Sequence, residues 1–147
     1  MTTGKHTFKD RQDCPDSGEI LFENYCESIG VKYHRVGFDS KLDPVSNFWK
    51  VHPTLRSLPD YLVEKGDDLF WCHVKGTANM KLKDFVTYSD FETNLVHNCR
   101  FFVVFCFKEQ EPIFRTMADI NKLMVGQSVQ QWHDGVQYIN LNLNINL

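Results

Sequence analysis

Apolar residues recur along the first part of the chain at helical spacing and then gather in short runs. Residues 16–28 carry them on one face, which predicts an amphipathic helix. Asp16 and Glu19 resemble a capping box at its start, and Gly30 is well placed to end it. Residues 31–38 then predict a strand.

Two further apolar runs, residues 58–63 and 69–76, flank a short polar segment. That segment, residues 64–68, has the Gly and Asp residues of a hairpin loop, so the two runs predict antiparallel strands. Asp60 follows a proline at the first strand, and Lys75 lies at the end of the second. The hairpin is therefore expected to hold an acid and an amine side by side.

The second half of the chain continues the alternation of helix and strand. Residues 84–98 predict a second helix. Its buried stripe consists of Phe85, Tyr88, Phe91 and Leu95. The apolar run 101–107 is typical of a strand covered on both faces. Residues 113–116 favour a short strand and 118–124 a short helix. The strict alternation of 139–147 predicts a half-buried strand or a strand-like tail.

The length of 147 residues favours one domain, and 42% hydrophobic residues with 12 Phe supply a substantial core. Residues 1–15 are polar and are expected to form a flexible N-terminal arm, so the domain would span 16–147. Residues 39–57 contain two prolines and are expected to be a loop. Helix, three strands, helix and strand in this order predict an α/β fold, with a central mixed sheet flanked by helices.

The formal net charge of −3 excludes a wholly basic nucleic-acid coat but allows a local basic groove. Five cysteines without a CxxC pair indicate reduced thiols rather than a disulfide framework or a zinc site. No run approaches the length of a membrane span, and no apolar signal segment is present, so we expect a soluble, cytoplasmic protein. The sequence has no Gly-rich phosphate loop, nucleophile elbow or HExxH motif, which argues against the corresponding enzyme classes.

Side chains alternate along the strand that ends at Lys75. His73 and Lys75 share one face, which is expected to point away from the apolar packing side, while Cys72 takes the other face. This arrangement argues against a Cys–His nucleophilic pair. A lysine near the end of a buried strand needs a partner or a task. The alternative, a lysine that reaches solvent beside a hydrogen-bonded histidine, stays open.

The helical Glu23, the dipeptide Pro59-Asp60 and the terminal Lys75, in the order α-β-β-β-α-β, resemble the PD-(D/E)XK nuclease superfamily over residues 18–124. This restriction endonuclease-like group includes restriction enzymes, exonucleases, junction resolvases and repair nucleases. The resemblance implies that Asp60 binds a metal ion, that Lys75 is catalytic, and that Glu23 takes the acidic position of the first helix.

His73 departs from the superfamily pattern, because an Asp or Glu is expected two residues before the lysine. Three explanations stay open. His73 could bind the metal ion through nitrogen, which would favour Mn²⁺ over Mg²⁺. Glu92 on the second helix could supply the missing carboxylate. Alternatively, the chain has lost catalysis and binds nucleic acid or a protein partner.

The resemblance implies Mg²⁺- or Mn²⁺-dependent hydrolysis of phosphodiester bonds in DNA, without excluding RNA. Asp60, the Val74 carbonyl and one further ligand would hold the ion, with Glu23 reaching it directly or through water. Lys75 would orient the attacking water or stabilise charge on the phosphate. Many nucleases of this group pair to cut both strands, so a homodimer is also an expectation.

The polar residues after Lys75 are candidates for DNA backbone contacts. They are Thr77, Asn79, Lys81 and Lys83, which we expect in one loop. A merely solvated charged loop is the alternative. Trp132, His133 and Tyr138 form a further aromatic and polar cluster, which we interpret first as packing of a C-terminal addition and second as a base-stacking surface.

Overall fold

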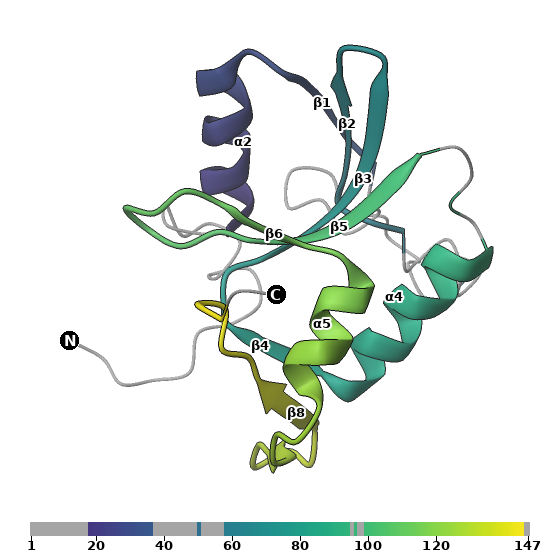
Figure 1. Cartoon of the computed structure of the whole chain (residues 1–147), viewed down its shortest axis with the longest axis vertical. Helices are drawn as coiled ribbons and strands as arrows, with labels where there is room; N and C mark the ends of the chain where they lie inside the picture. Colours follow the sequence, from purple (N-terminus) through teal and green to yellow (C-terminus); the bar gives the residue numbers. More distant parts are fainter. Residues whose placement is uncertain (1–17, 37–49, 51–57, 95, 97–98, 146–147) are drawn as a thin grey trace.

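The structure is a computed structural model, and it describes residues 18–36, 50, 58–94, 96 and 99–145. The predicted arm, the Asp16 cap and nearly all of the loop predicted at 39–57 lie outside these residues. In chain order the elements are α2 (Gly18–Ile29), β1 (Lys32–Arg35), β2 (Tyr61–Lys65), β3 (Asp68–Lys75), β4 (Asn79–Lys81), α4 (Leu82–Asn94), β5 (Arg100–Phe105), β6 (Ile113–Arg115), α5 (Met117–Met124), β7 (Gln130–Gln131) and β8 (Gln137–Asn140) (Figure 1).

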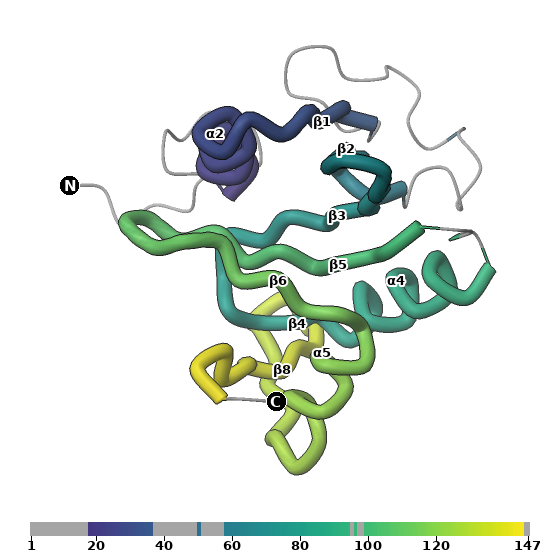
Figure 2. The backbone as a smooth tube through the Cα atoms, turned by 45° about the horizontal axis from the view of Figure 1, so that its top comes forward, coloured from purple at the N-terminus to yellow at the C-terminus, as the bar shows by residue number. Residues whose placement is uncertain are grey.

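A five-stranded mixed sheet in the order β1-β2-β3-β5-β6 forms the centre of the molecule. β3 and β5 run parallel, with β4 and α4 making the crossover between them, and the other neighbouring strands are antiparallel. Figure 2 shows α2 on one side of this sheet and α4, α5 and a small second sheet on the other. The predicted fold class, a central mixed sheet flanked by helices in the order α-β-β-β-α-β, is confirmed.

Local sequence signals account for the bounds of the first elements. Gly30 follows α2 with a φ of 71°, the left-handed conformation that glycine adopts easily at a helix end. Gly66 has a φ of 60° in the turn between β2 and β3, so the predicted hairpin is confirmed. Its register pairs Tyr61 with Cys72, which fixes the faces on which the candidate site residues lie.

Hydrophobic cores lie on both faces of the sheet. Phe22, Tyr61 and Cys72 belong to the core under α2, whereas Phe91 and Phe101 belong to the core shared with α4, α5 and β8. Strand β5 contributes to both cores, as its continuous apolar sequence predicted.

A second sheet, in the order β4-β8-β7, was not predicted from the sequence. The strand expected over 139–147 is wrong in its extent, because β8 ends at Asn140 and turns follow. Leu141 and Leu143 are nevertheless buried in the core on the α4 side. The alternation therefore marks burial against that core rather than strand pairing along the whole segment.

Two further expectations concern the cysteines and membrane-spanning segments. Cys26, Cys72, Cys99 and Cys106 are all free thiols, as predicted for this part of the chain. Among the described residues, no helix has both the length and the apolar character needed to cross a membrane.

Candidate active site

Asp60 occupies the point where β2 begins, between β1 and β3. The Val74 N–H donates a hydrogen bond of 2.8 Å to Oδ2 of Asp60, and the backbone carbonyl of Asp60 accepts one of 3.0 Å from Val36. A carboxylate that accepts from a backbone N–H makes a charge-assisted bond, stronger than one between neutral groups. The Asp60 side chain thus accepts the Val74 N–H where a neighbouring strand would offer a backbone carbonyl, and this hydrogen bond fixes the position of the carboxylate.

The same geometry directs the Val74 carbonyl toward Asp60. The Lys75 carbonyl accepts from the Cys106 N–H at 2.9 Å, so the backbone groups of Lys75 point to β5. Those of Val74, one residue earlier, point to the opposite neighbour, the side on which Asp60 lies. The carboxylate of Asp60 and the carbonyl oxygen of Val74 are therefore directed toward one another at the start of β2.

Lys75 lies on the same face of the sheet as His73, two residues before it, and its side chain is largely buried. Burial lowers its pKa below the ordinary value, and Lys81 adds to this effect. Asp84 and Asp60 act in the opposite direction. The ammonium group is thus poorly hydrated, with two carboxylates as its electrostatic counterparts.

His73 is 8% exposed, and its ring stacks on Tyr88 of α4 with centroids 3.9 Å apart. Nδ1 lies 3.8 Å from Oδ2 of Asp60, while Nε2 is buried and has no hydrogen-bond partner among the described residues. The expectation that this face points away from packing is wrong. Helix α4 covers it, because Tyr88 and Phe91 pack on His73 and Trp71.

Glu23, predicted as the acidic residue of the first helix, belongs to α2, which packs on the opposite face of the sheet from His73. The Tyr61 hydroxyl donates a short hydrogen bond to it, and the Tyr33 hydroxyl lies 3.4 Å from it. Tyr61 belongs to the core under α2, whereas the neighbouring Asp60 approaches His73 on the other face. The Glu23 carboxylate therefore contacts two tyrosine hydroxyls and lies 4.0 Å from Arg35, and its place in the site stays a prediction.

Glu19 lies one turn earlier on α2 and follows Gly18, whose backbone approaches Gly76 and Lys75 at the end of β3. It forms an ion pair of 3.0 Å with Arg35, and both side chains are about three-quarters buried. Burial alone would lower the pKa of Arg35, but it is raised overall, chiefly by the hydrogen bond and charge of Glu19 and less by Tyr61 and Asp60. Arg35 also lies 4.0 Å from Glu23. The adjacent Gly18 could have indicated this position, since a glycine allows the helix to approach a strand closely.

Glu92, the second predicted carboxylate, lies on α4 one helical turn beyond Tyr88, toward Phe91 and away from Lys75. Partial burial raises its pKa. The carboxylate of α4 that acts on Lys75 is Asp84, at the start of the helix. Sequence reasoning missed it because the direction of α4 across the sheet decides which turn faces Lys75.

The expectation that the four polar DNA-binding candidates share one loop is wrong. Thr77 lies in the turn after β3, Asn79 and Lys81 lie in strand β4, and Lys83 is exposed on α4. The Lys81 ammonium lies 5.8 Å from the ring centroid of Trp132, in cation–π geometry. The rings of Trp132 and Tyr138 stack with centroids 4.1 Å apart, which agrees with the packing role preferred from the sequence.

Comparisons with known proteins find matches among the solved structures. No family model and no curated protein matches the chain. The structure is similar to that of Hjc, a Holliday junction resolvase from Archaeoglobus fulgidus. The similarity has a TM-score of 0.45 and 12% sequence identity, and it covers 84% of this chain and 83% of that one. A likeness at this level does not establish a shared activity, and the residues of the site stand on their own geometry.

A divalent cation, which the superfamily resemblance implies, finds few ligands here. The described residues contain no group of three or more His, Cys, Asp or Glu able to hold a metal ion. Asp60 and His73 offer one oxygen and one nitrogen 3.8 Å apart, compatible with bonds of about 2.0–2.2 Å to one ion. With the Val74 carbonyl they supply three donors, so an ion held here would take most of its ligands from water; the 3.8 Å separation suits neither adjacent nor opposite positions of an ideal Mg²⁺ octahedron.

Proposed function

We propose that this chain is a metal-dependent nuclease that hydrolyses phosphodiester bonds in DNA. The observation that carries the proposal is the fixed position of Asp60, whose carboxylate accepts from the Val74 N–H on the face that also bears Lys75. A carboxylate and an ammonium group held beside the Val74 carbonyl are suited to binding an ion and a phosphate together.

In this proposal each residue has a separate task. Asp60 and the Val74 carbonyl would hold Mg²⁺ or Mn²⁺, with His73 as a nitrogen ligand through Nδ1. A bound ion would supply the acidity that makes a water molecule nucleophilic. Lys75, with its poorly hydrated ammonium group, would hold that water by hydrogen bonds and stabilise charge on the scissile phosphate.

The third acidic group is proposed differently from the sequence expectation. Glu19 is the proposed group because it follows Gly18, which approaches the end of β3, and because its ion pair with Arg35 is the shorter one, 3.0 Å against 4.0 Å for Glu23. Asp84 would hold the charge on Lys75. Lys81, in strand β4 directly after the site, is the proposed contact to a DNA phosphate, with Thr77, Asn79 and Lys83 as further candidates.

The test is cleavage of linear, supercoiled and branched DNA with Mg²⁺, with Mn²⁺ and with a chelator. We expect cleavage that depends on the ion and falls by about a hundredfold or more in Asp60→Asn and in Lys75→Met. Asp67→Asn, an exposed aspartate in the same hairpin, is the matched control and should keep full activity. Equal cleavage by the wild type and by Asp60→Asn would refute the proposal.

A second candidate function follows from His73. Its stacking on Tyr88 removes the ring from solvent, and the described residues have few donors for a metal ion. These observations favour a nuclease-like module that binds DNA without cutting it. Tight binding of labelled DNA by fluorescence anisotropy, unchanged in Asp60→Asn and unaccompanied by cleavage with either ion, would select this alternative. A homodimer stays a prediction for sedimentation analysis.

A further inference from the structure

The two faces of the central sheet are covered unequally. Two helices and the small second sheet pack on one face, whereas α2 packs on the other, against β1 and β3 (Figure 2). On that face, Phe102 of β5 and Phe114 of β6 stay partly exposed. Ile29 at the end of α2 is 48% exposed.

A cavity of about 300 Å³ opens between α2 and the part of this face that no described helix covers. This volume lies at the lower end of the range of about 300–1,000 Å³ that is typical of small-molecule sites. Its main apolar walls are Phe22, Cys26 and Ile29 from α2, and Phe70, Phe102 and Phe114 from the strands. The cavity lies on the opposite face from Lys75 and is separate from the candidate active site.

The aromatic wall of this cavity is preorganised. Phe70 and Phe102 meet edge to face with centroids 5.8 Å apart, and Phe102 and Phe114 repeat the same arrangement at 5.8 Å. Edge-to-face pairs are a favoured geometry for aromatic rings. A ligand would therefore meet a formed surface of ring edges and faces, rather than side chains that must first be ordered.

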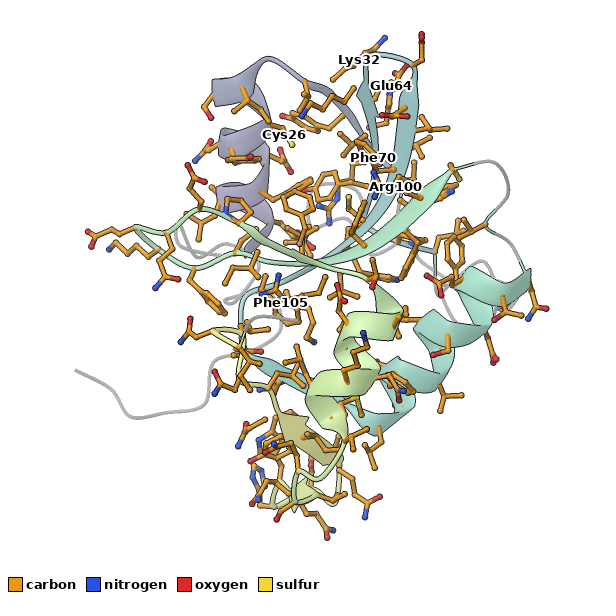
Figure 3. All side chains as sticks on the ribbon, viewed as in Figure 1. Cys26, Lys32, Glu64, Phe70, Arg100 and Phe105 are labelled. Atoms are coloured by element: carbon orange, nitrogen blue, oxygen red, sulfur yellow. The ribbon has the colours of Figure 1, made fainter. Side chains whose placement is uncertain are left out.

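Two basic residues also line the cavity. The Arg100 guanidinium lies 5.2 Å from the ring centroid of Phe102 and 5.9 Å from that of Phe70. Lys65, the last residue of β2, is the second basic residue of the lining. Figure 3 shows Arg100 beside Phe70, with Cys26 on the neighbouring helix. Within the described part of the chain, neither Arg100 nor Lys65 forms an ion pair with a carboxylate, so their charges are available to a ligand.

The interior of the cavity carries no charge of its own. Cys26 and Cys72 line it, and burial is the main cause that raises the pKa of Cys26 to about 11, with Glu23 and Glu27 adding to the effect. Burial raises the pKa of Cys72 as well. Both thiols are therefore protonated at neutral pH and behave as small apolar groups. Charge is confined to Lys65 and Arg100, which are exposed.

We propose that this cavity binds a small organic anion with an apolar body and one carboxylate or sulfonate group. The apolar body would lie against Phe70, Phe102 and Phe114, and the anionic group would pair with Arg100 and Lys65. Charge complementarity and the limited volume favour such a molecule. The proposal is independent of the nuclease function.

The experiment measures the fluorescence of anilinonaphthalene sulfonate bound to the full chain, and its displacement by octanoate and by octanol. We expect one saturable site, with octanoate effective at a concentration about tenfold lower than octanol. Lys65→Gln combined with Arg100→Gln should abolish this preference. Lys122→Gln, an exposed lysine on α5 outside the cavity, is the control for charge. Ile29→Gln should weaken displacement by both ligands, and Val86→Gln, 59% exposed on α4, should not.

Circular dichroism melts would confirm that each variant folds. The preference for octanoate over octanol in the wild type should also decrease as NaCl is added, because salt screens exposed charges, and this measurement needs no variant. Equal displacement by octanoate and octanol, or fluorescence that never saturates, would overturn the proposal. A dimer in sedimentation velocity whose formation excludes the probe would overturn it too, with a second copy of the chain as the occupant.

Discussion

The carboxylate of Asp60 has two separable roles, one in stability and one in the proposed chemistry. It accepts the Val74 N–H, and a buried donor left without a partner costs about 1–3 kcal/mol. Asp60→Ala removes this acceptor, whereas Asp60→Asn keeps an oxygen in its place. We therefore expect Asp60→Ala to be less stable than Asp60→Asn by about 1 kcal/mol in urea denaturation, while both lose cleavage. Equal stability of the two variants would show that the contact contributes little.

Lys75 is expected to lower the stability of the fold at neutral pH. Burial lowers its pKa below the ordinary 10.5, so the folded chain holds this proton less tightly than the unfolded chain. The penalty for a charged Lys75 is complete below the lowered pKa and disappears as the pH rises toward 10.5. Lys75→Met should therefore raise the free energy of unfolding at pH 7, with a smaller gain at pH 10.

Urea denaturation at the two pH values measures this difference, with the exposed Lys83→Met as the control. A variant that is more stable but has lost cleavage would be typical of a residue kept for function. If Lys75→Met were less stable than the wild type by the same amount at both pH values, the attraction from Asp84 and Asp60 would outweigh the effect of burial.

At the scale of single residues, sequence alone brought Asp60, His73 and Lys75 to one face. The turn at Gly66 sets the register of the hairpin, which brings Asp60 beside the end of β3. The alternation of side chains along β3 then places His73 and Lys75 on the same face. Glu19 and Asp84 could not be predicted in this way. Their proximity depends on how α2 and α4 cross the sheet, which periodicity within one helix does not specify.

At the scale of elements, the contact between α2 and the end of β3 is the tightest feature of the site. A Cβ added at Gly18 would lie 3.0 Å from the Gly76 nitrogen and 3.1 Å from the Lys75 carbonyl carbon. A Cβ at Gly76 would lie 3.4 Å from the Gly18 nitrogen, an ordinary contact. The two glycines face each other, but they do not tolerate a methyl group equally.

We expect Gly18→Ala to destabilise the protein by about 1–3 kcal/mol, because backbone atoms must shift to admit the methyl group. The same shift moves α2 and Glu19 away from Lys75, so any cleavage activity should fall as well. Gly76→Ala is the matched control and should change stability by less than about 1 kcal/mol. Thermal melts and cleavage assays measure the two effects. Similar melting temperatures for both variants would contradict this account of the contact.

The main helices and the sheet were predictable because each has a clear period and a boundary residue. The strands β4 and β7 have three and two residues, too few for alternation to appear. The pairing of β4 with β8 joins Met80 to Ile139, far apart in the chain, and no local pattern reports it.

At the scale of the whole molecule, the C-terminal segment is part of the main core rather than an addition to it. Ile139, Leu141 and Leu143 are each less than 8% exposed and pack in the core on the α4 side. The sequence revealed their alternation but not the core that buries them, since that core is built from elements distributed over the chain.

We expect Ile139→Ala to lower the free energy of unfolding by about 2–4 kcal/mol, the usual effect of removing a buried branched side chain. Asn140→Ala, at the exposed neighbouring position, should change it by less than about 0.5 kcal/mol. Urea denaturation followed by tryptophan fluorescence measures both values. A small effect for Ile139→Ala would show that the segment is dispensable.

The hydrogen bond between Val74 and Asp60 joins residues 14 positions apart. The bond from Cys106 to Lys75 instead needs the crossover through α4. Short loops close at a lower entropic cost than long ones. During refolding, pulsed amide exchange should therefore find the Val74 N–H protected before the Cys106 N–H. On the ribosome, the Asp60 carboxylate could then bind the Val74 N–H while β5, which pairs with β3, is still being synthesised.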